Sequence, residues 1–207
     1  MSPCFGTPEQ WWSAPASWDT YSMGKLTYSV HTSLDGYTND ANGKFDFAEP
    51  DEEVHAFVND EERSVGTYLF GRRMYETMAV WETWDTTTEP RVVKDFAKIW
   101  SHTNKIVYSA GLHSVGTRLT RLERTFDPVE VRAVKESSAE DLQIGGATLA
   151  AEAFRGGLVD EVELFLSPVI VGGGLQALPV DVRLDLSLLE ERHFASGVVY
   201  LHYRVGP

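Results

Sequence analysis

The stretch DLQIGGATLAAEAFRGGLVD, residues 141–160, carries the pattern that decides the fold. An apolar run ends at Ile144, the pair Gly145 and Gly146 follows at once, and the next residues repeat their apolar side chains at helical spacing. The pattern predicts a strand, a glycine turn and a helix. A glycine pair lets the backbone come close to a ligand, and a helix start presents free N–H groups to an anion. We expect a phosphate at this turn, with a plain tight turn as the alternative.

Two other predicted strands end in a similar way. Residues 67–70 run into Gly-Arg-Arg at 71–73, at the start of a helix, which makes a second candidate phosphate site. The alternative is a pair of exposed arginines on a helix. Residues 104–108 end in the small polar turn 109–111. Because ligands of open α/β sheets bind at the carboxyl ends of strands, we expect the three turns to line one cleft that suits a dinucleotide.

The composition limits the possible partners. The chain has 207 residues, with 31 Asp and Glu against 18 Lys and Arg, so its formal net charge of −13 disfavours binding to nucleic acid or to anionic membranes. The single cysteine, Cys4, excludes an internal disulfide, and the six histidines lack HxxxH or HxH spacing, so we expect no metal. No apolar run is long enough to span a membrane and no secretion signal precedes residue 23, so we expect no membrane partner and a cytoplasmic location.

The rest of the chain is expected to form one domain, residues 23–207. Residues 1–22 contain three tryptophans but no helical or strand periodicity, and we interpret them as an N-terminal arm, either a disordered tail or a segment docked through its tryptophans. A strand at 25–31 leads into a long polar loop, which is either a flap over a site or a surface loop. The helix that starts near Glu52 is expected to keep most of its acidic side chains in solvent.

The remaining elements alternate between helix and strand before a final hairpin. The patterns predict helices at 87–100 and 128–136, and strands at 116–123, 162–170, 182–189 and 198–205. This order favours an α/β fold of three layers, α/β/α, with a mixed, mainly parallel central sheet and a C-terminal antiparallel hairpin. Pro168 suggests that the strand at 162–170 lies at an edge or contains a bulge.

Six short sequences in this order resemble the dihydrofolate reductase-like superfamily: SLDG (33–36), LFGRRMYE (69–76), IVYSAG (106–111), DLQIGGATLA (141–150), LVDEVEL (158–164) and SPVIVGGG (167–174). Within it, the chain is similar to the reductase domain of the bifunctional riboflavin-biosynthesis deaminase-reductase and to its stand-alone relatives. The resemblance runs from about residue 25 to the C-terminus. A deaminase zinc motif is absent from the sequence, so only the reductase half is implied.

The resemblance implies NADPH as the cofactor. Carried over position by position, it assigns the adenosine and its 2′-phosphate to Gly71, Arg72, Arg73, Met74, Ser109 and Ala110. It assigns the pyrophosphate to Gly145, Gly146, Ala147 and Thr148. It places the nicotinamide near Thr32 and Leu34, with Gly173 close by. Many relatives have Thr where this chain has Met74, so a hydroxyl contact to phosphate would be replaced here by a backbone N–H.

Three residues are candidates for the substrate side of the site. Asp35, in the SLDG sequence, is our first choice for a polar substrate contact, with a β-turn role as the alternative. In folate enzymes a carboxylate on the first helix binds the pterin, and the spacing of this chain puts His55 at that position, with Glu52 nearby. This departure argues against folate as the substrate, although an imidazole could still donate a proton.

Our leading hypothesis is an NADPH-dependent reductase that transfers a hydride to a small heterocyclic substrate, pterin-like or pyrimidine-like, or to a carbonyl substrate. The alternatives are a nucleotide-binding module without turnover and a flavin-binding oxidoreductase. The expected partners are a small-molecule substrate and a second copy of the chain. We expect a homodimer because the terminal hairpin offers a strand edge and because related reductases pair.

Overall fold

The computed structural model describes residues 23–206. The predicted arm, residues 1–22, therefore lies outside the described residues. The strands are β1 (Leu26–Ser33), β2 (Tyr37–Asn39), β3 (Val65–Gly71), β4 (Asn104–Tyr108), β5 (Thr120–Glu123), β6 (Asp141–Gly145), β7 (Glu161–Ser167), β8 (Leu175–Gln176), β9 (Leu186–His193) and β10 (Val199–Val205). The helices are η1 (Asp46–Ala48), α1 (Glu52–Glu62), α2 (Arg72–Met78), η2 (Ala79–Glu82), α3 (Arg91–His102), α4 (Pro128–Ser137) and α5 (Ala147–Arg155).

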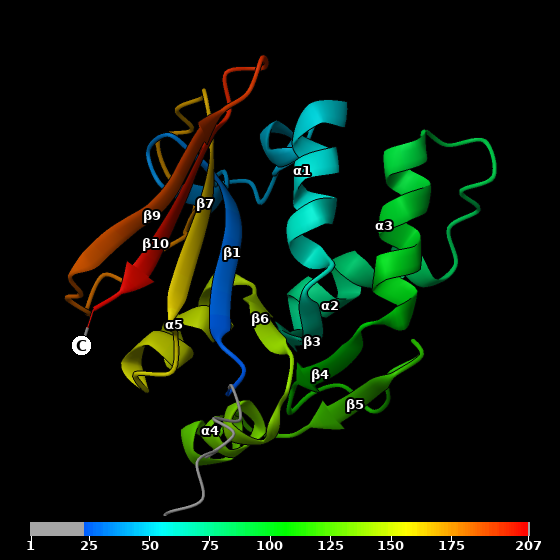
Figure 1. Cartoon of the computed structure of the whole chain (residues 1–207), viewed down its shortest axis with the longest axis vertical. Helices are drawn as coiled ribbons and strands as arrows, with labels where there is room; N and C mark the ends of the chain where they lie inside the picture. The colour runs from blue at the N-terminus through cyan, green and yellow to red at the C-terminus, as the bar shows by residue number, and fades with distance from the viewer. Residues whose placement is uncertain (1–22, 207) are drawn as a thin grey trace, which may run out of the picture.

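An eight-stranded sheet in the order β5-β4-β3-β6-β1-β7-β10-β9 forms the centre of the molecule (Figure 1). Neighbouring strands from β5 to β7 are parallel, whereas β10 pairs with β7 and with β9 in antiparallel fashion. Helices α1, α2 and α3 lie on one face, and α4 and α5 lie on the other. The predicted three-layer α/β/α fold with a mainly parallel sheet and a C-terminal hairpin is confirmed.

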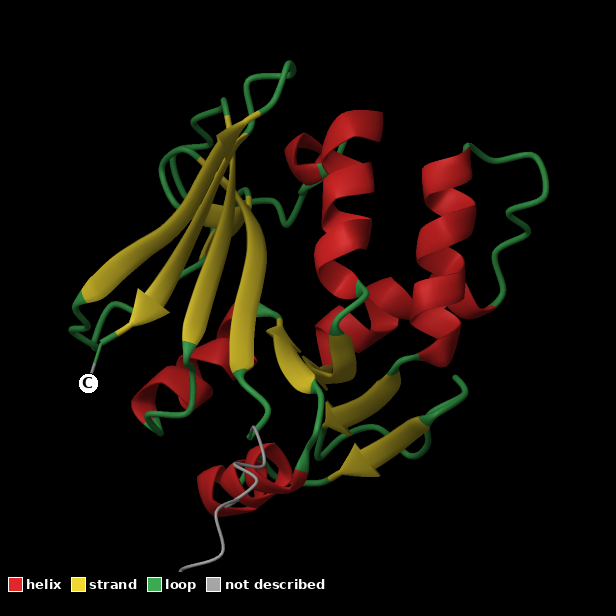
Figure 2. Ribbon diagram, viewed as in Figure 1, coloured by secondary structure: helices red, strands yellow, loops and turns green. Residues whose placement is uncertain are grey.

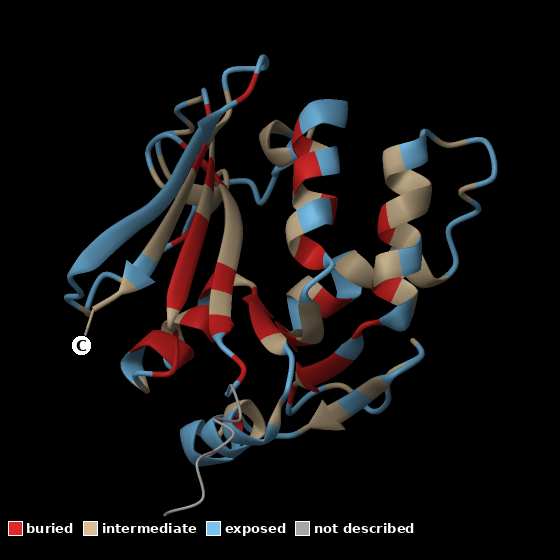
Figure 3. Ribbon diagram, in the orientation of Figure 1, coloured by how far each residue is buried: buried red, intermediate tan, exposed pale blue. Residues whose placement is uncertain are grey.

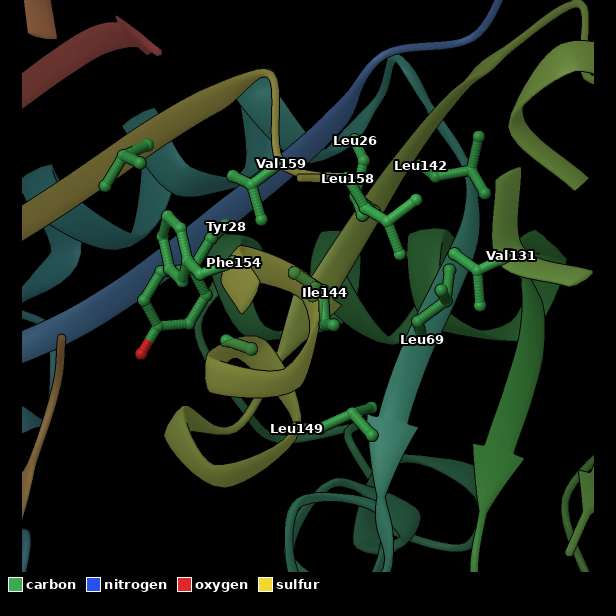
Figure 4. Close-up of a cluster of buried hydrophobic side chains, with 13 residues drawn as sticks. Leu26, Tyr28, Leu69, Val131, Leu142, Ile144, Leu149, Phe154, Leu158 and Val159 are labelled. Atoms are coloured by element: carbon green, nitrogen blue, oxygen red, sulfur yellow. The ribbon is translucent and has the colours of Figure 1, made fainter. Parts of the chain in front are cut away.

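The face beneath α4 and α5 is covered by one apolar cluster (Figure 4). Alternate residues of β1 point into it, including Leu26 and Tyr28, and α5 contributes Phe154, whose ring meets that of Tyr28 edge to face at 5.6 Å. Val131 of α4 closes the cluster. This face is buried because every strand in the centre of the sheet supplies apolar side chains to it.

Two smaller clusters cover the opposite face. Under α2 and α3, the rings of Tyr68, Phe70 and Trp100 stack with their planes within 21° of one another. Under α1, Phe57 packs on Tyr200 of β10 and closes a second aromatic cluster. α1 and α3 stand next to each other on this face (Figure 2).

Local signals explain where several helices begin and end. The Asp51 carboxylate accepts a hydrogen bond from Val54 N at 2.8 Å and so caps α1, and Asp127 caps α4 just before Pro128. α5 begins after Gly146, at φ 93°, and is followed by Gly157, at φ 58°. The predicted glycine turn before α5 is confirmed.

Two expectations about strands were wrong. β7 lies between β1 and β10 rather than at an edge, and it ends at Ser167, one residue before Pro168. The proline therefore ends the strand and interrupts no ladder, which is why an interior strand tolerates it. β5 covers only residues 120–123, because Leu119, just before it, has φ 51° and cannot be part of an extended strand.

Candidate functional site

The carboxyl ends of β4, β3 and β6 lie next to one another. β3 is parallel to both neighbours, and the register pairs Gly71 with Tyr108 and Phe70 with Gly145. The three predicted turns therefore follow adjacent strands that end at the same level of the sheet. The expected convergence agrees with this register, while the role of these turns in cofactor binding stays a prediction.

The turn after β3 has free space beside its glycine and two exposed arginines next to it. A Cβ on Gly71 would lie 3.7 Å from the Leu149 Cβ, an ordinary contact, and the φ of −75° is one that any residue adopts. Packing therefore does not require glycine at this position. Arg72 and Arg73 are exposed at the start of α2, and within residues 23–206 neither guanidinium pairs with a carboxylate. An anion would find two uncommitted cations here.

The turn after β6 has a structural reason for each of its glycines. A Cβ on Gly145 would lie 2.6 Å from a ring atom of Phe70, and Gly146 has φ 93°. Met74 packs against both positions, because its Cγ would lie 3.3 Å from a Cβ on Gly145 and its Cβ 3.2 Å from one on Gly146. The Met74 side chain thus joins the turn after β3 to the turn after β6.

The first turn of α5 and the turn after β4 complete this edge of the sheet. Ala147 is buried and Thr148 is exposed, so the threonine hydroxyl is open to solvent beside the glycine turn. The Ser109 Oγ accepts hydrogen bonds from the backbone N–H groups of Gly111, at 3.2 Å, and Leu112, at 3.1 Å. The hydroxyl of Ser109 therefore holds its own turn in place, and Ala110 lies exposed at the tip.

β1 pairs with β6 only over its first three residues. The register runs from Leu26 with Leu142 to Tyr28 with Ile144, after which β6 ends and β1 continues to Ser33 along β7. Residues 30–33 of β1 therefore extend past the end of β6, in the middle of the sheet. Such a separation of neighbouring strands at their carboxyl ends is where open α/β sheets bind ligands.

The predicted nicotinamide contacts lie at this end of β1. Thr32 is buried, and its Oγ1 lies 3.1 Å from the Ser33 carbonyl oxygen and 3.2 Å from that of Tyr37. Leu34 is exposed, and its backbone N–H donates to the Val169 carbonyl at 2.8 Å. The loop that carries Gly173 is thereby tied to the end of β1. The nicotinamide assignment itself stays a prediction.

The Asp35 carboxylate fixes the glycine-rich loop 172–174. Its Oδ1 accepts from the Ser33 hydroxyl at 2.7 Å and from Val171 N at 3.1 Å, and its Oδ2 accepts from Gly172 N at 2.7 Å. The Ser33 hydroxyl, followed by the two backbone N–H groups, lowers the pKa of Asp35 below its usual value. Both oxygens therefore have partners within the protein, and a substrate contact by Asp35 stays a prediction.

The N-terminal half of α1 faces the same end of the sheet. Because β1 and β3 both run parallel to β6, α1 must return in the opposite direction, and Glu53 of its first turn accepts from Ala195 N at the tip of the β9–β10 hairpin. The partly buried His55 ring lies 6.2 Å from the Trp81 ring and 5.9 Å from Phe96, and burial lowers its pKa. Glu52 is exposed.

Buried carboxylates on α1 and β7 were missed by the sequence analysis. Glu62, at the end of α1, accepts from the Tyr68 hydroxyl at 2.7 Å and from the Gln143 amide at 2.9 Å, and burial raises its pKa to about 7. Burial likewise raises the pKa of Glu163, on β7, to about 7. Most of the acids of α1 lie in solvent, as predicted, and Glu62 is the exception. It continues the helical stripe of Val54 and Phe57, and that spacing was the available signal.

Two hollows in the described part of the chain lie away from these strand ends. One of about 400 Å³ lies beside α3 and is lined by Thr86, Thr87, Lys94, Ala97, Lys98 and Ser101. The other, of about 240 Å³, lies near the amino ends of β3 and β4, with Glu62 and Asn104 in its wall. Neither contains a residue assigned to the cofactor or to the substrate.

Residues 23–206 contain no group of three or more His, Cys, Asp or Glu side chains arranged to hold a metal ion. None of their helices has both the length and the apolar character that crossing a bilayer requires.

Comparison with known proteins gives consistent results. The chain is 28% identical over 185 residues to the uncharacterized protein YyaP of Bacillus subtilis, covering 86% of this chain and 94% of YyaP. Its fold is similar to that of a diaminohydroxyphosphoribosylaminopyrimidine deaminase/5-amino-6-(5-phosphoribosylamino)uracil reductase from Thermotoga maritima, with a TM-score of 0.62 and 15% identity over 90% of this chain and 58% of the other. It is also similar to Enterococcus faecalis dihydrofolate reductase complexed with NADP(H), with a TM-score of 0.54 and 14% identity over 89% of this chain and 98% of the other.

The family comparison covers most of the domain. The model of the RibD C-terminal domain matches residues 24–200, from the start of β1 into β10. This range includes every turn described above. The chain belongs to the RibD C-terminal domain family, and its fold is similar to that of dihydrofolate reductase.

Proposed function

We propose that this chain is an NADPH-dependent reductase that transfers a hydride to a small, flat heterocyclic substrate, pterin-like or pyrimidine-like, or to a carbonyl substrate. The observation that supports it best is the register that brings the ends of β4, β3 and β6 together beside two arginines that lack carboxylate partners within residues 23–206. Membership of a reductase-domain family supports the reaction class. A similar fold that is known with NADP(H) supports the cofactor.

The residues at these strand ends suit a phosphorylated dinucleotide. Arg72 and Arg73 would pair with the 2′-phosphate, since guanidinium groups match phosphate geometry. Gly71 leaves room for close approach, because a Cβ there would fill space that the protein does not use. The remaining contacts would come from Met74, Ser109, Ala110, Gly145, Gly146, Ala147 and Thr148. The bound cofactor would supply a hydride from its nicotinamide ring.

The end of β1 would orient the two reacting rings. Where β1 continues past the end of β6, the backbone near Thr32 and Leu34 can border a flat ring, and the loop with Gly173 is held close by the Asp35 carboxylate. His55 faces this end from α1 and would hold a proton near the substrate, with Glu52 and Asp35 as further polar candidates. The contribution of these side chains would be placement and proton supply.

Cofactor binding can be tested by thermal unfolding with NADPH and with NADH. A ligand at a hundredfold excess over its dissociation constant stabilises a protein by about 2.7 kcal/mol, so NADPH should raise the midpoint clearly. The double variant Arg72→Ala, Arg73→Ala should lose most of the shift with NADPH. Arg183→Ala, at an exposed arginine near the opposite end of the sheet, should keep the full shift. No shift of the native protein with either nucleotide would remove the proposal.

A second candidate is a nucleotide-binding module without turnover. It is favoured by the Asp35 carboxylate, whose oxygens are both committed to the protein, and by the exposed position of Glu52. It predicts NADPH binding without oxidation by any pterin, pyrimidine or quinone. Sustained NADPH consumption that disappears in the Arg72→Ala, Arg73→Ala variant would exclude it.

We also propose a homodimer and a cytoplasmic location. β9 is exposed along its whole length at the edge of the sheet (Figure 3), and apolar side chains are exposed on and before it. Ile170, Val180, Leu184, Leu186, Leu188 and Leu189 belong to this set. A second copy paired along this edge would cover them and complete the β9 ladder.

A further inference from the structure

His31 lies on β1 beyond the point where β1 and β6 separate. The register pairs it with Phe165 of β7, and the two rings stack at 4.6 Å with their planes 10° apart. Phe165 is itself buried in the aromatic cluster that holds α1 on the sheet. The plane of the imidazole is therefore fixed by a residue that cannot move independently of the core.

The His31 side chain points toward α1. Side chains alternate along a strand, and Tyr28 and Val30 contribute to the apolar cluster under α5, so His31 must lie on the other face. His55 lies close enough on that side to act on it electrostatically. Burial, together with His55, lowers the pKa of His31 to about 4. The imidazole is thus uncharged at neutral pH, with one nitrogen as donor and the other as acceptor.

The ring nitrogens of His31 have no hydrogen-bond partner in the part of the chain that the structure describes. Within residues 23–206 neither nitrogen forms a hydrogen bond, and neither is among the buried polar atoms that lack a partner, so solvent reaches this edge of the ring. The other partly buried histidine of the sheet differs, because the His202 Nε2 lies 3.1 Å from Glu161 Oε2. A stacked, uncharged imidazole with two free nitrogens is a ready site for a neutral polar group.

We infer that His31 is a substrate-binding residue that selects an uncharged carbonyl or ring-nitrogen edge on the flat acceptor. The inference rests on the proposed function for the location of the substrate, and it adds His31 to the residues proposed to contact that substrate. The uncharged ring can donate one hydrogen bond and accept another, but it supplies no opposite charge to offset the desolvation of an anion or a cation. Phe165 sets the direction of the hydrogen bond through the stacking contact.

Binding of lumazine, an uncharged bicyclic heterocycle with carbonyl groups, tests this role directly. With ¹⁵N-labelled histidine, the His31 ring signals of the native protein should show a neutral imidazole at neutral pH and should shift when lumazine is added. His31→Phe keeps an aromatic ring over Phe165 but removes both nitrogens, so it should weaken lumazine binding about tenfold, the worth of one hydrogen bond. His31→Gln restores a donor and an acceptor and should recover part of the affinity.

The controls separate this role from folding and from cofactor binding. His102→Phe, at an exposed histidine at the far end of α3, should leave lumazine binding unchanged. NADPH stabilisation measured on the same variants should be equal in His31→Phe and in the native protein. Lumazine is titrated both with and without NADP⁺. If the protein binds lumazine but not the nucleotide, the proposed function fails while the role of His31 is still tested. Unmoved His31 signals, native affinity in His31→Phe, or no lumazine binding at millimolar concentration would each overturn the inference.

Discussion

The two faces of the central sheet are buried in different ways. Beneath α4 and α5 the buried contacts are mainly apolar, from Leu26 to Phe154 (Figure 4), and the Tyr28 hydroxyl donates to the Ala177 carbonyl at 2.7 Å. Beneath α1 the same strands bury Glu62 and Gln143 in a hydrogen-bonded group, with Glu163 and His31 on the same side. Burying polar and charged groups lowers the free energy of unfolding unless they are paired, and this effect is therefore larger on the α1 face than on the α5 face. We therefore expect a substitution in the apolar cluster under α5 to lower stability at any pH, and the buried carboxylates under α1 to make stability depend on pH.

The largest expected effect comes from the apolar face. Phe154→Ala removes a buried ring that meets Tyr28 edge to face, and it should lower the free energy of unfolding by about 3–5 kcal/mol. Urea unfolding measures this loss. Val129→Ala, at a side chain that is 74% exposed on α4, should change stability by less than about 0.5 kcal/mol. Equal effects of the two substitutions would show that burial of the Phe154 ring in this cluster does not stabilise the fold.

The polar face should make stability depend on pH. Burial raises the pKa of Glu62 to about 7 from an ordinary value of 4.5, so the folded state holds this proton more tightly than the unfolded state does. The contribution of Glu62 to the free energy of unfolding should therefore be fully present below pH 4.5, fall as the pH rises toward 7, and be lost above it. The expected loss is roughly 3 kcal/mol for a group this deeply buried. Glu163 should contribute in the same direction and window.

Glu62→Gln isolates this contribution. The amide stays neutral at every pH, so the slope of unfolding free energy between about pH 4.5 and 7 should become shallower than in the native protein. Glu52→Gln, at an exposed acid on the same helix, should leave the slope unchanged. Denaturant unfolding at a series of pH values compares the three proteins. The same slope in Glu62→Gln and in the native chain would show that Glu62 does not titrate in this window.

The apolar face could be predicted from the sequence better than the polar one. The glycine turn at 145–146, the cap at Asp51 and the alternation of β1 are local signals, and each element that depends on them was found. The early end of the β1–β6 pairing depends on contacts between segments more than a hundred residues apart, and no local pattern encodes it. The same holds for the Asp35 contact with Gly172. The sequence therefore located the strand ends and the edge of the sheet that they share, but not the early end of the β1–β6 pairing or the contact of Asp35 with the loop 172–174.

At Gly71, the last residue of β3, a substitution is expected to lower cofactor affinity while leaving stability nearly unchanged. Gly71→Ala should change the free energy of unfolding by less than about 0.5 kcal/mol, because the added Cβ meets only an ordinary contact with Leu149. If the cofactor backbone passes there, its affinity should nevertheless fall about tenfold. Gly116→Ala, with no atom within 4 Å of the new Cβ, is the matched control. Native NADPH affinity in Gly71→Ala would place the cofactor elsewhere.

The smallest effect on stability is expected at β9, where neither face is covered. Leu188 is 50% exposed and pairs with Tyr203 across the hairpin, so Leu188→Glu should leave the unfolding free energy of one subunit within about 0.5 kcal/mol of its native value. In the proposed homodimer, however, the carboxylate would be buried without a partner. Light scattering at micromolar concentration should therefore give a dimer for the native chain and a monomer for Leu188→Glu. Val129→Glu, on the exposed side of α4, should remain dimeric. A monomeric native chain would contradict the proposed homodimer. The exposed leucines of β9 would then not be covered by a second copy of the chain.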